Sequence, residues 1–314
     1  SLKPGWQRRR IENFQVLTAG GKADEDLVAD SWTSIIKKIP VMQQHNAAGL
    51  TAEQRTAGAE LADFAKMEEV RARVDALVAD PATAEALKPW YGYFCKRPCF
   101  HDEYLQTFNR DNVTLVDTRG RGVERITETG VVADGVEFEL DCLIFATGFE
   151  VGTDYAQRTG FELIGRDGVS LSEKWRNGVR TFQGLSVHGL PNCFIESIAQ
   201  SGFTVNFPYL LDVQANHVAW IIAWALEHGC SEVEPSASAE AAWVETVCAR
   251  SEATAQRAKS CTPGYYNREG QANAKTRQGS FFFGQPTEYA DILDGWRRRG
   301  DLDGLEVRTE EVAR

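Results

Sequence analysis

The segments Tyr91–Asp117, YGYFCKRPCFHDEYLQTFNRDNVTLVD, and Asp141–Phe149, DCLIFATGF, decide how this chain is interpreted. The first places two adjacent cations, Lys96 and Arg97, among aromatic residues and prolines. Most such pairs are solvated surface charges, but this setting favours a site that needs positive charge. The second is an apolar run that stops at Gly148, which predicts a buried parallel strand ending where the backbone approaches a ligand. Together they indicate a nucleotide-dependent enzyme.

The composition is that of a soluble globular protein. The chain has 314 residues, of which 43% are hydrophobic and 25% are charged, enough for two domains. The formal net charge of -11 argues against a nucleic acid or an anionic membrane as the main partner. An anionic ligand must then be held by local cations. No apolar run approaches the roughly 20 residues that a membrane span needs.

The spacing of cysteines and glycines indicates the state of the thiols and bears on the kind of nucleotide-binding motif present. The seven cysteines are an odd number with no CxxC pair, which favours reduced thiols in a cytoplasmic protein over disulfides or zinc. We therefore expect no metal site. The dinucleotide fingerprint GxGxxG is absent from the sequence, and Gly120-Arg121-Gly122 predicts a hairpin turn instead.

Residues 1–90 have helical periodicity and no evident chemistry, which predicts a scaffold or lid. One helix is expected over Asp24–Ile39. A capping box of Thr51 and Gln54 opens another. The apolar stripe of that second helix is expected to be Leu61, Phe64, Val70, Val74 and Leu77.

The middle of the chain has strand patterns. Val113–Asp117 is a short apolar run, residues 121–139 alternate like an antiparallel ribbon, and Asp141–Ala146 predicts a buried strand. Two further short strands are expected in Thr181–Gly189 and Pro191–Glu196.

A loop rich in small and amide residues, Ala199–Asn206, leads into an apolar helix that Gly229 ends. Such a loop at a helix N-terminus favours a phosphate, ribityl or flavin contact, although a well-capped core helix explains the pattern as well. Gln214 and His217 on this helix are expected to be hydrogen-bonding residues at the edge of the core. Further helices are expected over residues 237–259 and 288–298.

In their order along the chain, these features resemble the Baeyer–Villiger monooxygenases, the class B flavoprotein oxygenases. The helical insertion is followed by five landmarks: CKRP at 95–98, FNRDNVTLVD at 108–117, FATGF at 145–149, HGLPN at 188–192 and CTPGYYN at 261–267. The PGYYN ending resembles the branch that acts on bulky cyclic, steroid-like or aryl ketones.

The resemblance implies an α/β flavoprotein with two Rossmann-like dinucleotide-binding domains and a helical insertion. Residues 1–90 would be the insertion, 91–147 the second half of the NADP-binding domain, and 148–314 the C-terminal part of the FAD-binding domain. The family's two glycine fingerprints lie upstream of the insertion. The chain therefore looks like the C-terminal half of such an enzyme, lacks the N-terminal FAD and NADP fingerprints, and would bind FAD poorly by itself.

The resemblance also implies site residues. Lys96 matches the lysine that meets the 2′-phosphate of NADPH, and Arg97 matches the catalytic arginine beside the flavin. The hinge between the nucleotide domains, near both cofactors, would be Ala146, Thr147 and Gly148. Cofactor contacts are expected further on from Gln200, Asn206 and, in place of a late-loop tryptophan of many members, Tyr265 or its neighbour Tyr266.

The implied reaction converts a ketone, with NADPH and O2, to an ester or lactone. In the family a flavin C4a-peroxide attacks the ketone, and Arg97 would keep that peroxide deprotonated and stabilise the tetrahedral Criegee adduct. Two alternatives stay open: a flavoenzyme that oxygenates nitrogen or sulfur, and a non-catalytic remnant of the fold. The helical insertion argues against the first, and the presence of Lys96 and Arg97 argues against the second. The ketone, the regioselectivity and the oligomeric state are left open.

Overall fold

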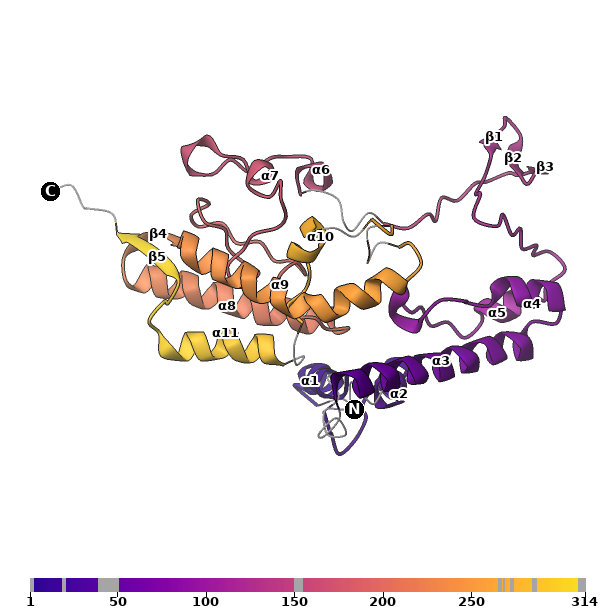
Figure 1. Cartoon of the computed structure of the whole chain (residues 1–314), viewed down its shortest axis with the longest axis horizontal. Helices are drawn as coiled ribbons and strands as arrows, with labels where there is room; N and C mark the ends of the chain where they lie inside the picture. The colour runs from indigo at the N-terminus through magenta and orange to yellow at the C-terminus, as the bar shows by residue number, and fades with distance from the viewer. Residues whose placement is uncertain are drawn as a thin grey trace. The chain divides into compact units, whose positions relative to one another are not determined.

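The computed structural model describes residues 3–18, 21–38, 51–149, 155–264, 267, 269–271, 274–283 and 287–309. Figure 1 shows a mixture of helices and small antiparallel sheets. By its internal contacts the chain divides into two compact units, one of residues 1–59 and 151–314 and the other of residues 60–150. The predicted boundaries at 90 and 147 concern membership of nucleotide-binding domains, which this division does not decide.

Helix α3, Ala52–Leu77, crosses the boundary at residue 60, and its larger part forms the base of the 60–150 unit. The predicted capping box opens this helix, since the Thr51 amide donates to Gln54 Oε1 at 2.9 Å and the Gln54 amide donates to Thr51 Oγ1 at 3.2 Å. Helices α4, Pro81–Leu87, and α5, Tyr104–Thr107, lie against its C-terminal end (Figure 1). Their shared core contains Val74, Val78 and Ala84, with Leu87, Leu105 and Phe108 beside it.

The apolar stripe of α3 differs from the prediction. Leu61 and Phe64 are 68% and 57% exposed, whereas Met67 and Val74 are buried. The buried face also includes Asp63, which is 8% exposed. Residues 63, 67 and 74 follow helical spacing, so the buried face is a different one from that predicted, and an acid occupies one of its positions.

The predicted ribbon forms in the same unit. Strands β1, Arg125–Ile126, β2, Gly130–Ala133, and β3, Val136–Glu139, pair antiparallel in the order β1-β2-β3. The turn between β2 and β3 has positive φ at both Asp134 and Gly135, which matches the right-handed twist of a tight hairpin.

Two predicted strands of this unit are wrong. Residues 113–117 and 141–146 belong to no strand among the residues that the structure describes. Ile144 is 81% exposed and Phe145 is 72% exposed. A parallel strand becomes buried only when neighbouring strands and helices cover it, and the described residues supply none here.

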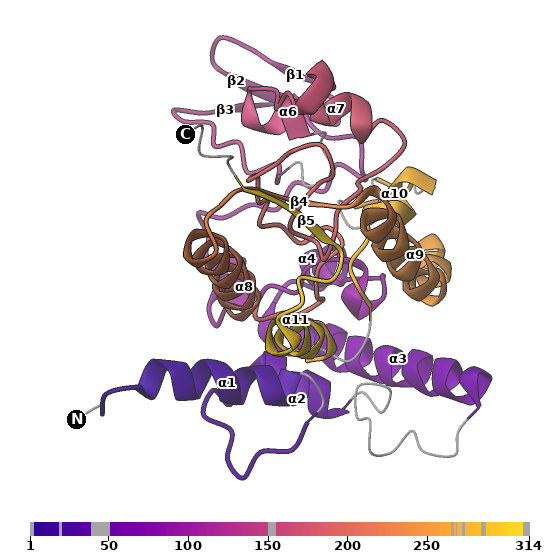
Figure 2. The same ribbon diagram turned by 90° about the vertical axis from the view of Figure 1, so that its left-hand side faces the viewer.

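The other unit packs three long helices around a strand pair. Helices α8, Phe207–Glu227, α9, Ala237–Ser260, and α11, Glu288–Arg299, lie around β4, Cys230–Pro235, and β5, Leu305–Thr309 (Figure 2). Strand β4 pairs antiparallel with β5. The structure thus confirms the three helices predicted here from apolar periodicity.

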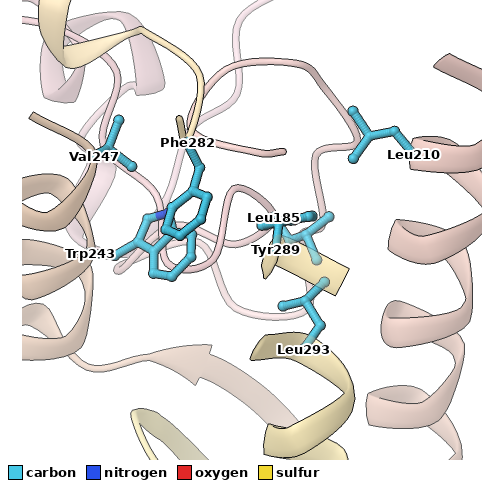
Figure 3. Close-up of a cluster of buried hydrophobic side chains, with 7 residues drawn as sticks. All are labelled: Leu185, Leu210, Trp243, Val247, Phe282, Tyr289 and Leu293. Atoms are coloured by element: carbon cyan, nitrogen blue, oxygen red, sulfur yellow. The ribbon is translucent and has the colours of Figure 1, made fainter. Parts of the chain in front are cut away.

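The core of this unit joins elements distant in sequence. Figure 3 shows side chains from α8, α9, α11 and two connecting segments gathered in one cluster. The Trp243 and Phe282 rings stack at 5.2 Å between centroids. The members are Leu185, Leu210, Trp243, Val247, Phe282, Tyr289 and Leu293. Ile221, Ala225, Val233, Trp296 and Leu302 form a second cluster.

The remaining elements of this unit are α1, which is about as long as α11, and several shorter pieces. They are α1, Trp6–Thr18; α2, Ser31–Lys38; α6, Tyr155–Thr159; the 3-10 turn η2, Arg166–Gly168; α7, Leu171–Lys174; and α10, Ala274–Gln278. The two strands expected in 181–196 reduce to single bridges, Phe182 with Ser186 and Ser186 with Phe194.

The helix expected over 24–39 begins only at Ser31, and Ile39 lies outside the described residues. Asp26 Oδ1 accepts the amides of Val28 and Ala29, and Ala29 has a φ of 51°. These side-chain bonds form a turn that competes with helix. Asp30 Oδ1 then accepts the amides of Trp32 and Thr33, which makes Asp30 the N-cap.

Five cysteines carry free thiols: Cys99, Cys142, Cys193, Cys230 and Cys248. Cys95 and Cys261 are disulfide-bonded, so the expectation of reduced thiols is wrong for these two. None of the helices that the structure describes combines the length and the apolar character that a membrane crossing requires.

Candidate functional site

The Lys96–Arg97 pair follows a single 3-10 turn, η1, Tyr93–Cys95. The Cys95 amide donates to the Gly92 carbonyl at 2.9 Å and closes the turn. At Lys96 the backbone becomes extended, with φ -123° and ψ 161°. Successive side chains of an extended backbone point to opposite sides. The two neighbouring cations therefore face different surroundings.

Their environments differ accordingly. Lys96 is half-buried, with Nζ 6.0 Å from the centroid of the Tyr91 ring, near the outer limit of a cation–π contact. Burial raises the pKa of the Tyr91 phenol, which keeps the ring neutral. Arg97 is exposed. In the part of the chain that the structure describes, its guanidinium has no ion-pair or hydrogen-bond partner.

Two residues of α3 that the sequence analysis did not single out hold the segment before this pair. Asp63 Oδ1 accepts the Tyr93 amide at 2.9 Å. Arg71 donates to the Pro89 carbonyl at 3.0 Å and lies over the Trp90 ring at 4.6 Å. The signal in the sequence was an acid on the apolar face of a helix, which a charged residue occupies only when it is paired.

The predicted hinge, Ala146, Thr147 and Gly148, is exposed. Gly148 has a φ of 96°, and a Cβ added there would have open space around it. The left-handed backbone, rather than crowding, therefore requires glycine at this position. Gly148 itself has no side chain to hinder the approach of a phosphate or a ribose to its backbone.

Gln200 is fully buried and its side chain is hydrogen-bonded throughout. Its Oε1 accepts the amide and the hydroxyl of Thr181 at 2.8 and 2.6 Å, and its Nε2 donates to the carbonyls of Val179 and Gln278, both at 2.8 Å. Its own carbonyl accepts the Trp243 indole N–H at 3.0 Å. The side chain has no donor or acceptor left over, so any contribution to a cofactor site comes from the loop that it fixes.

Asn206 is 5% exposed and stands at the N-cap position of α8. Its Nδ2 donates to the Ile11 carbonyl of α1 at 3.1 Å. Thr204 nearby donates to Gln15 Oε1 at 2.8 Å. The loop that was expected to line a cofactor pocket is thus tied to α1 on one side. Tyr265 and Tyr266 lie outside the described residues.

The HGLPN segment is held by two buried carboxylates. Glu240, 2% exposed, accepts the His188 amide at 2.8 Å and the Arg180 Nε at 2.9 Å. Glu234, 5% exposed, accepts the Gly189 amide and an Arg166 N–H, both at 2.9 Å. Each buried charge has a cationic partner and a backbone donor, which offsets its desolvation.

His217 and Gln214 make hydrogen bonds, as predicted, but both are fully buried, whereas the prediction placed them at the edge of the core. Gln214 donates to the Ser197 carbonyl at 3.0 Å. Arg297 can only donate, so His217 Nδ1, 3.2 Å from Arg297 Nη1, accepts, and Nε2 donates to Gln183 Oε1 at 3.0 Å. Burial and the Arg297 charge lower the pKa of His217 to about 3. The imidazole is therefore neutral at physiological pH, and its hydrogen bonds link it to Gln183 and Arg297 of this unit.

The structure places Lys96, Arg97 and the 146–148 hinge in the 60–150 unit. Gln200 and Asn206 belong to the other unit. Within the first unit, the structure offers two differently placed cations, which suit anionic oxygen, and separately an exposed glycine backbone at Gly148. Within the second, it offers a rigid loop in front of α8.

No protein-family model matches the chain. The chain is 52% identical over 309 residues to neopentalenolactone D synthase of Streptomyces avermitilis, a match covering 98% of the chain and 52% of that protein. It is 46% identical over 309 residues to the Baeyer–Villiger monooxygenase ATR8 of Stachybotrys chlorohalonatus, covering 98% of the chain and 49% of that protein. The chain spans about half the length of the curated relatives it matches.

The chain is also similar to parts of solved structures. The polycyclic ketone monooxygenase of the thermophilic fungus Thermothelomyces thermophila superposes with a TM-score of 0.87 at 35% identity, covering 98% of this chain and 51% of that one. The structure of OTEMO in complex with FAD and NADP superposes with a TM-score of 0.64 at 25% identity, covering 78% and 44%.

Proposed function

The chain belongs to the Baeyer–Villiger monooxygenase family, and on that premise we propose that the protein oxygenates a ketone to an ester or lactone. The cofactors of this proposal are FAD and NADPH, and O2 supplies the inserted oxygen. FAD and NADP are the groups bound in a solved neighbour. The observation that carries the proposal is the Lys96–Arg97 pair on an extended backbone, with the arginine side chain available to a ligand.

The proposed roles follow from the two environments. Lys96 is half-buried and compact, so it binds one phosphate as a point charge. The 2′-phosphate of NADPH is such a group, and NADH lacks it. The exposed backbone at Gly148 lets the phosphate or ribose oxygens of the cofactor approach the chain. These residues of the 60–150 unit fit the binding of a phosphorylated nucleotide.

Arg97 is assigned the chemical step. When bound, FAD supplies the activation of O2 and NADPH supplies the reducing equivalents. The guanidinium of Arg97 carries several N–H donors and no acceptor. It therefore stabilises negative charge on oxygen while the ester forms. Such a donor contributes on the order of 3 to 4 kcal/mol to the transition state.

The substrate class proposed is a polycyclic or other bulky cyclic ketone. The support is the PGYYN ending of the sequence and the similarity to a polycyclic ketone monooxygenase. A single methylene in an apolar pocket changes discrimination by only about 1 to 3 kcal/mol. Neighbouring ketone sizes should therefore also react, at lower rates.

Product analysis tests this proposal. The full-length gene product that contains this chain would be supplied with FAD, NADPH, air and a panel of polycyclic, monocyclic, steroid and aryl ketones. The expected result is an ester or lactone, with the highest rate on a polycyclic ketone. Oxidation of sulfides or amines without any ester would establish the heteroatom oxygenase instead. Failure to bind flavin would leave the non-catalytic remnant.

A further inference from the structure

We propose that Asp63 and Arg71 of α3 are positioning residues for the Lys96–Arg97 pair. They fix Pro89 and Tyr93, the two ends of the segment that leads to the pair, and the disulfide-bonded Cys95 follows directly before Lys96. This inference rests on the proposed function, because it takes Lys96 as the residue that binds the 2′-phosphate of NADPH. It adds that the helix contributes to the orientation of this lysine, through contacts that lie outside the cofactor site and in addition to the disulfide at Cys95.

Asp63 acts as a cap from another element. Tyr93 is the first residue of η1, and the amide at that position has no partner inside a helical turn. The 2.9 Å bond to Asp63 Oδ1 satisfies it with a buried carboxylate. A bond to a charged acceptor is stronger than one between neutral groups. A Cβ added at Gly92 would lie 3.0 Å from Asp63 Oδ2, so glycine there permits the close approach.

Arg71 fixes the other end of the segment. Its guanidinium donates to the Pro89 carbonyl at 3.0 Å and covers the Trp90 ring at 4.6 Å. A second donor, Nη2, bonds Glu68 Oε1 at 2.6 Å and holds the plane of the group. The Arg71 side chain is only 12% exposed. A planar fork that stacks and donates at once is a property of arginine that lysine does not share.

The spacing of the two anchors matches the segment. Asp63 and Arg71 are two turns apart, about 12 Å along the helix. The four Cα-to-Cα steps from Pro89 to Tyr93 span at most about 13 Å when the chain is extended. The segment thus runs antiparallel to α3 and is fixed at both ends. Lys96 lies three residues past Tyr93, about 6 Å at the rise of a 3-10 turn. Of the two anchors, Asp63 is therefore the nearer to the pair along the chain.

The test compares D63A with D63N in the full-length protein. The measurements are KM for NADPH and for NADH, the dissociation constant of NADP+, and hydrogen exchange at the Tyr93 amide. D63A should raise KM for NADPH and weaken NADP+ binding on the order of tenfold, the equivalent of one lost bond to a charged group. KM for NADH should stay within about twofold and the Tyr93 amide should lose protection. D63N should remain near wild type, because its amide oxygen still accepts.

D75A is the matched control, because Asp75 is also on α3 and pairs instead with Lys88, at 2.9 Å. It should leave the NADPH preference unchanged. An unchanged preference in D63A, an equal loss in D63N, or the same loss in D75A would overturn the proposal. If D63A does not fold, R71K replaces it, since it keeps the charge and removes the fork. R71K must then lower NADP+ affinity while NAD+ affinity holds, and equal losses would also overturn the proposal.

Failure of the proposed function is distinguishable from failure of this inference. NADP+ affinity and Tyr93 exchange are read without any oxygenation product. A wild-type protein that binds NADP+ but forms no ester contradicts the proposed reaction only. If Lys96→Ala leaves the affinity for NADP+ unchanged, the proposed role of Lys96 is contradicted. This holds independently of the effect of D63A on hydrogen exchange at the Tyr93 amide.

Discussion

Adjacent residues of one sequence motif can have separate tasks when the backbone between them is extended. Lys96 is half-buried beside Tyr91, and Arg97 is exposed and without an internal partner among the described residues. The sequence predicted that charge is needed here. Which cation is the more accessible could not be predicted, because it depends on φ and ψ at Lys96, which the η1 turn determines.

Substitution of Lys96 should separate the two nicotinamide cofactors. K96A removes the charge that meets the 2′-phosphate, so KM for NADPH should rise about 10- to 100-fold while KM for NADH changes little. K96R keeps the charge and should lose less. Steady-state kinetics of the full-length protein with both cofactors measures this. An equal rise in KM for NADPH and NADH would show that Lys96 does not contact the 2′-phosphate.

His217 should make stability depend on pH. Its pKa is lowered to about 3 in the folded chain by burial and by Arg297, against about 6.5 in an unfolded chain. The unfolded state therefore binds more protons between these values. The stability that neutral His217 contributes is complete above about pH 6.5 and is lost as the pH falls toward 3.

Chemical unfolding at a series of pH values checks this effect. Wild type should lose about 2 kcal/mol between pH 7 and pH 5 from this group, at about 1.4 kcal/mol per pH unit below 6.5. H217Q should unfold more easily at pH 7 but show a flatter profile. H101Q, a change at an exposed histidine, should keep the wild-type slope. Parallel profiles for H217Q and wild type would mean that other groups cause the pH dependence.

At the scale of elements, Gln200 shows how a residue can be identified correctly and its task misjudged. The loop Ala199–Asn206 was recognised by its small and amide residues in front of a helix. Which amides face a ligand could not be predicted, because the partners of Gln200 lie at Val179, Thr181 and Gln278. These partners come from segments far away in the sequence.

Gln200→Ala should therefore reduce stability strongly. It leaves the Thr181 amide and hydroxyl and the Gln278 carbonyl without this partner, whereas the Val179 carbonyl still accepts from Gln278 Nε2 at 3.0 Å. Each unsatisfied buried group costs about 1 to 3 kcal/mol. We expect a loss of at least about 3 kcal/mol in the free energy of unfolding. Q157A, at an exposed glutamine of α6, should change it by less than about 0.5 kcal/mol. A loss below about 1 kcal/mol for Q200A, measured by denaturant titration, would show that water replaces the side chain.

Helices and strands differ in how far their own sequence determines them. Helices α8, α9 and α11 were predicted because their apolar periodicity and end signals are local. The hairpin of β2 and β3 was predicted from Asp134-Gly135 for the same reason. The run 141–146 was not placed correctly, because burial of a parallel strand depends on neighbours that its sequence does not contain.

At the scale of the whole molecule, the order of the landmarks carried more information than any single element. CKRP, FATGF and HGLPN each occur in segments without a regular helix or strand of more than three residues. Their order along the chain nevertheless identified the family that the relatives represent. Tertiary hydrogen bonds fix HGLPN through Glu234 and Glu240, and Asp63 fixes Tyr93, two residues before CKRP. The sequence alone did not identify these three acids.

The measurement that tests the central claim most directly is the ratio of ester formed to NADPH consumed in Arg97→Ala. In the full-length protein with a ketone that the wild type converts, this variant should still reduce the flavin with NADPH at a rate near wild type. Ester formation should fall by at least about 100-fold, and the NADPH consumed should appear as hydrogen peroxide. R97K should recover only part of the yield. Ester formation by R97A at a rate near that of the wild type would contradict the assignment of Arg97 to the oxygenation step.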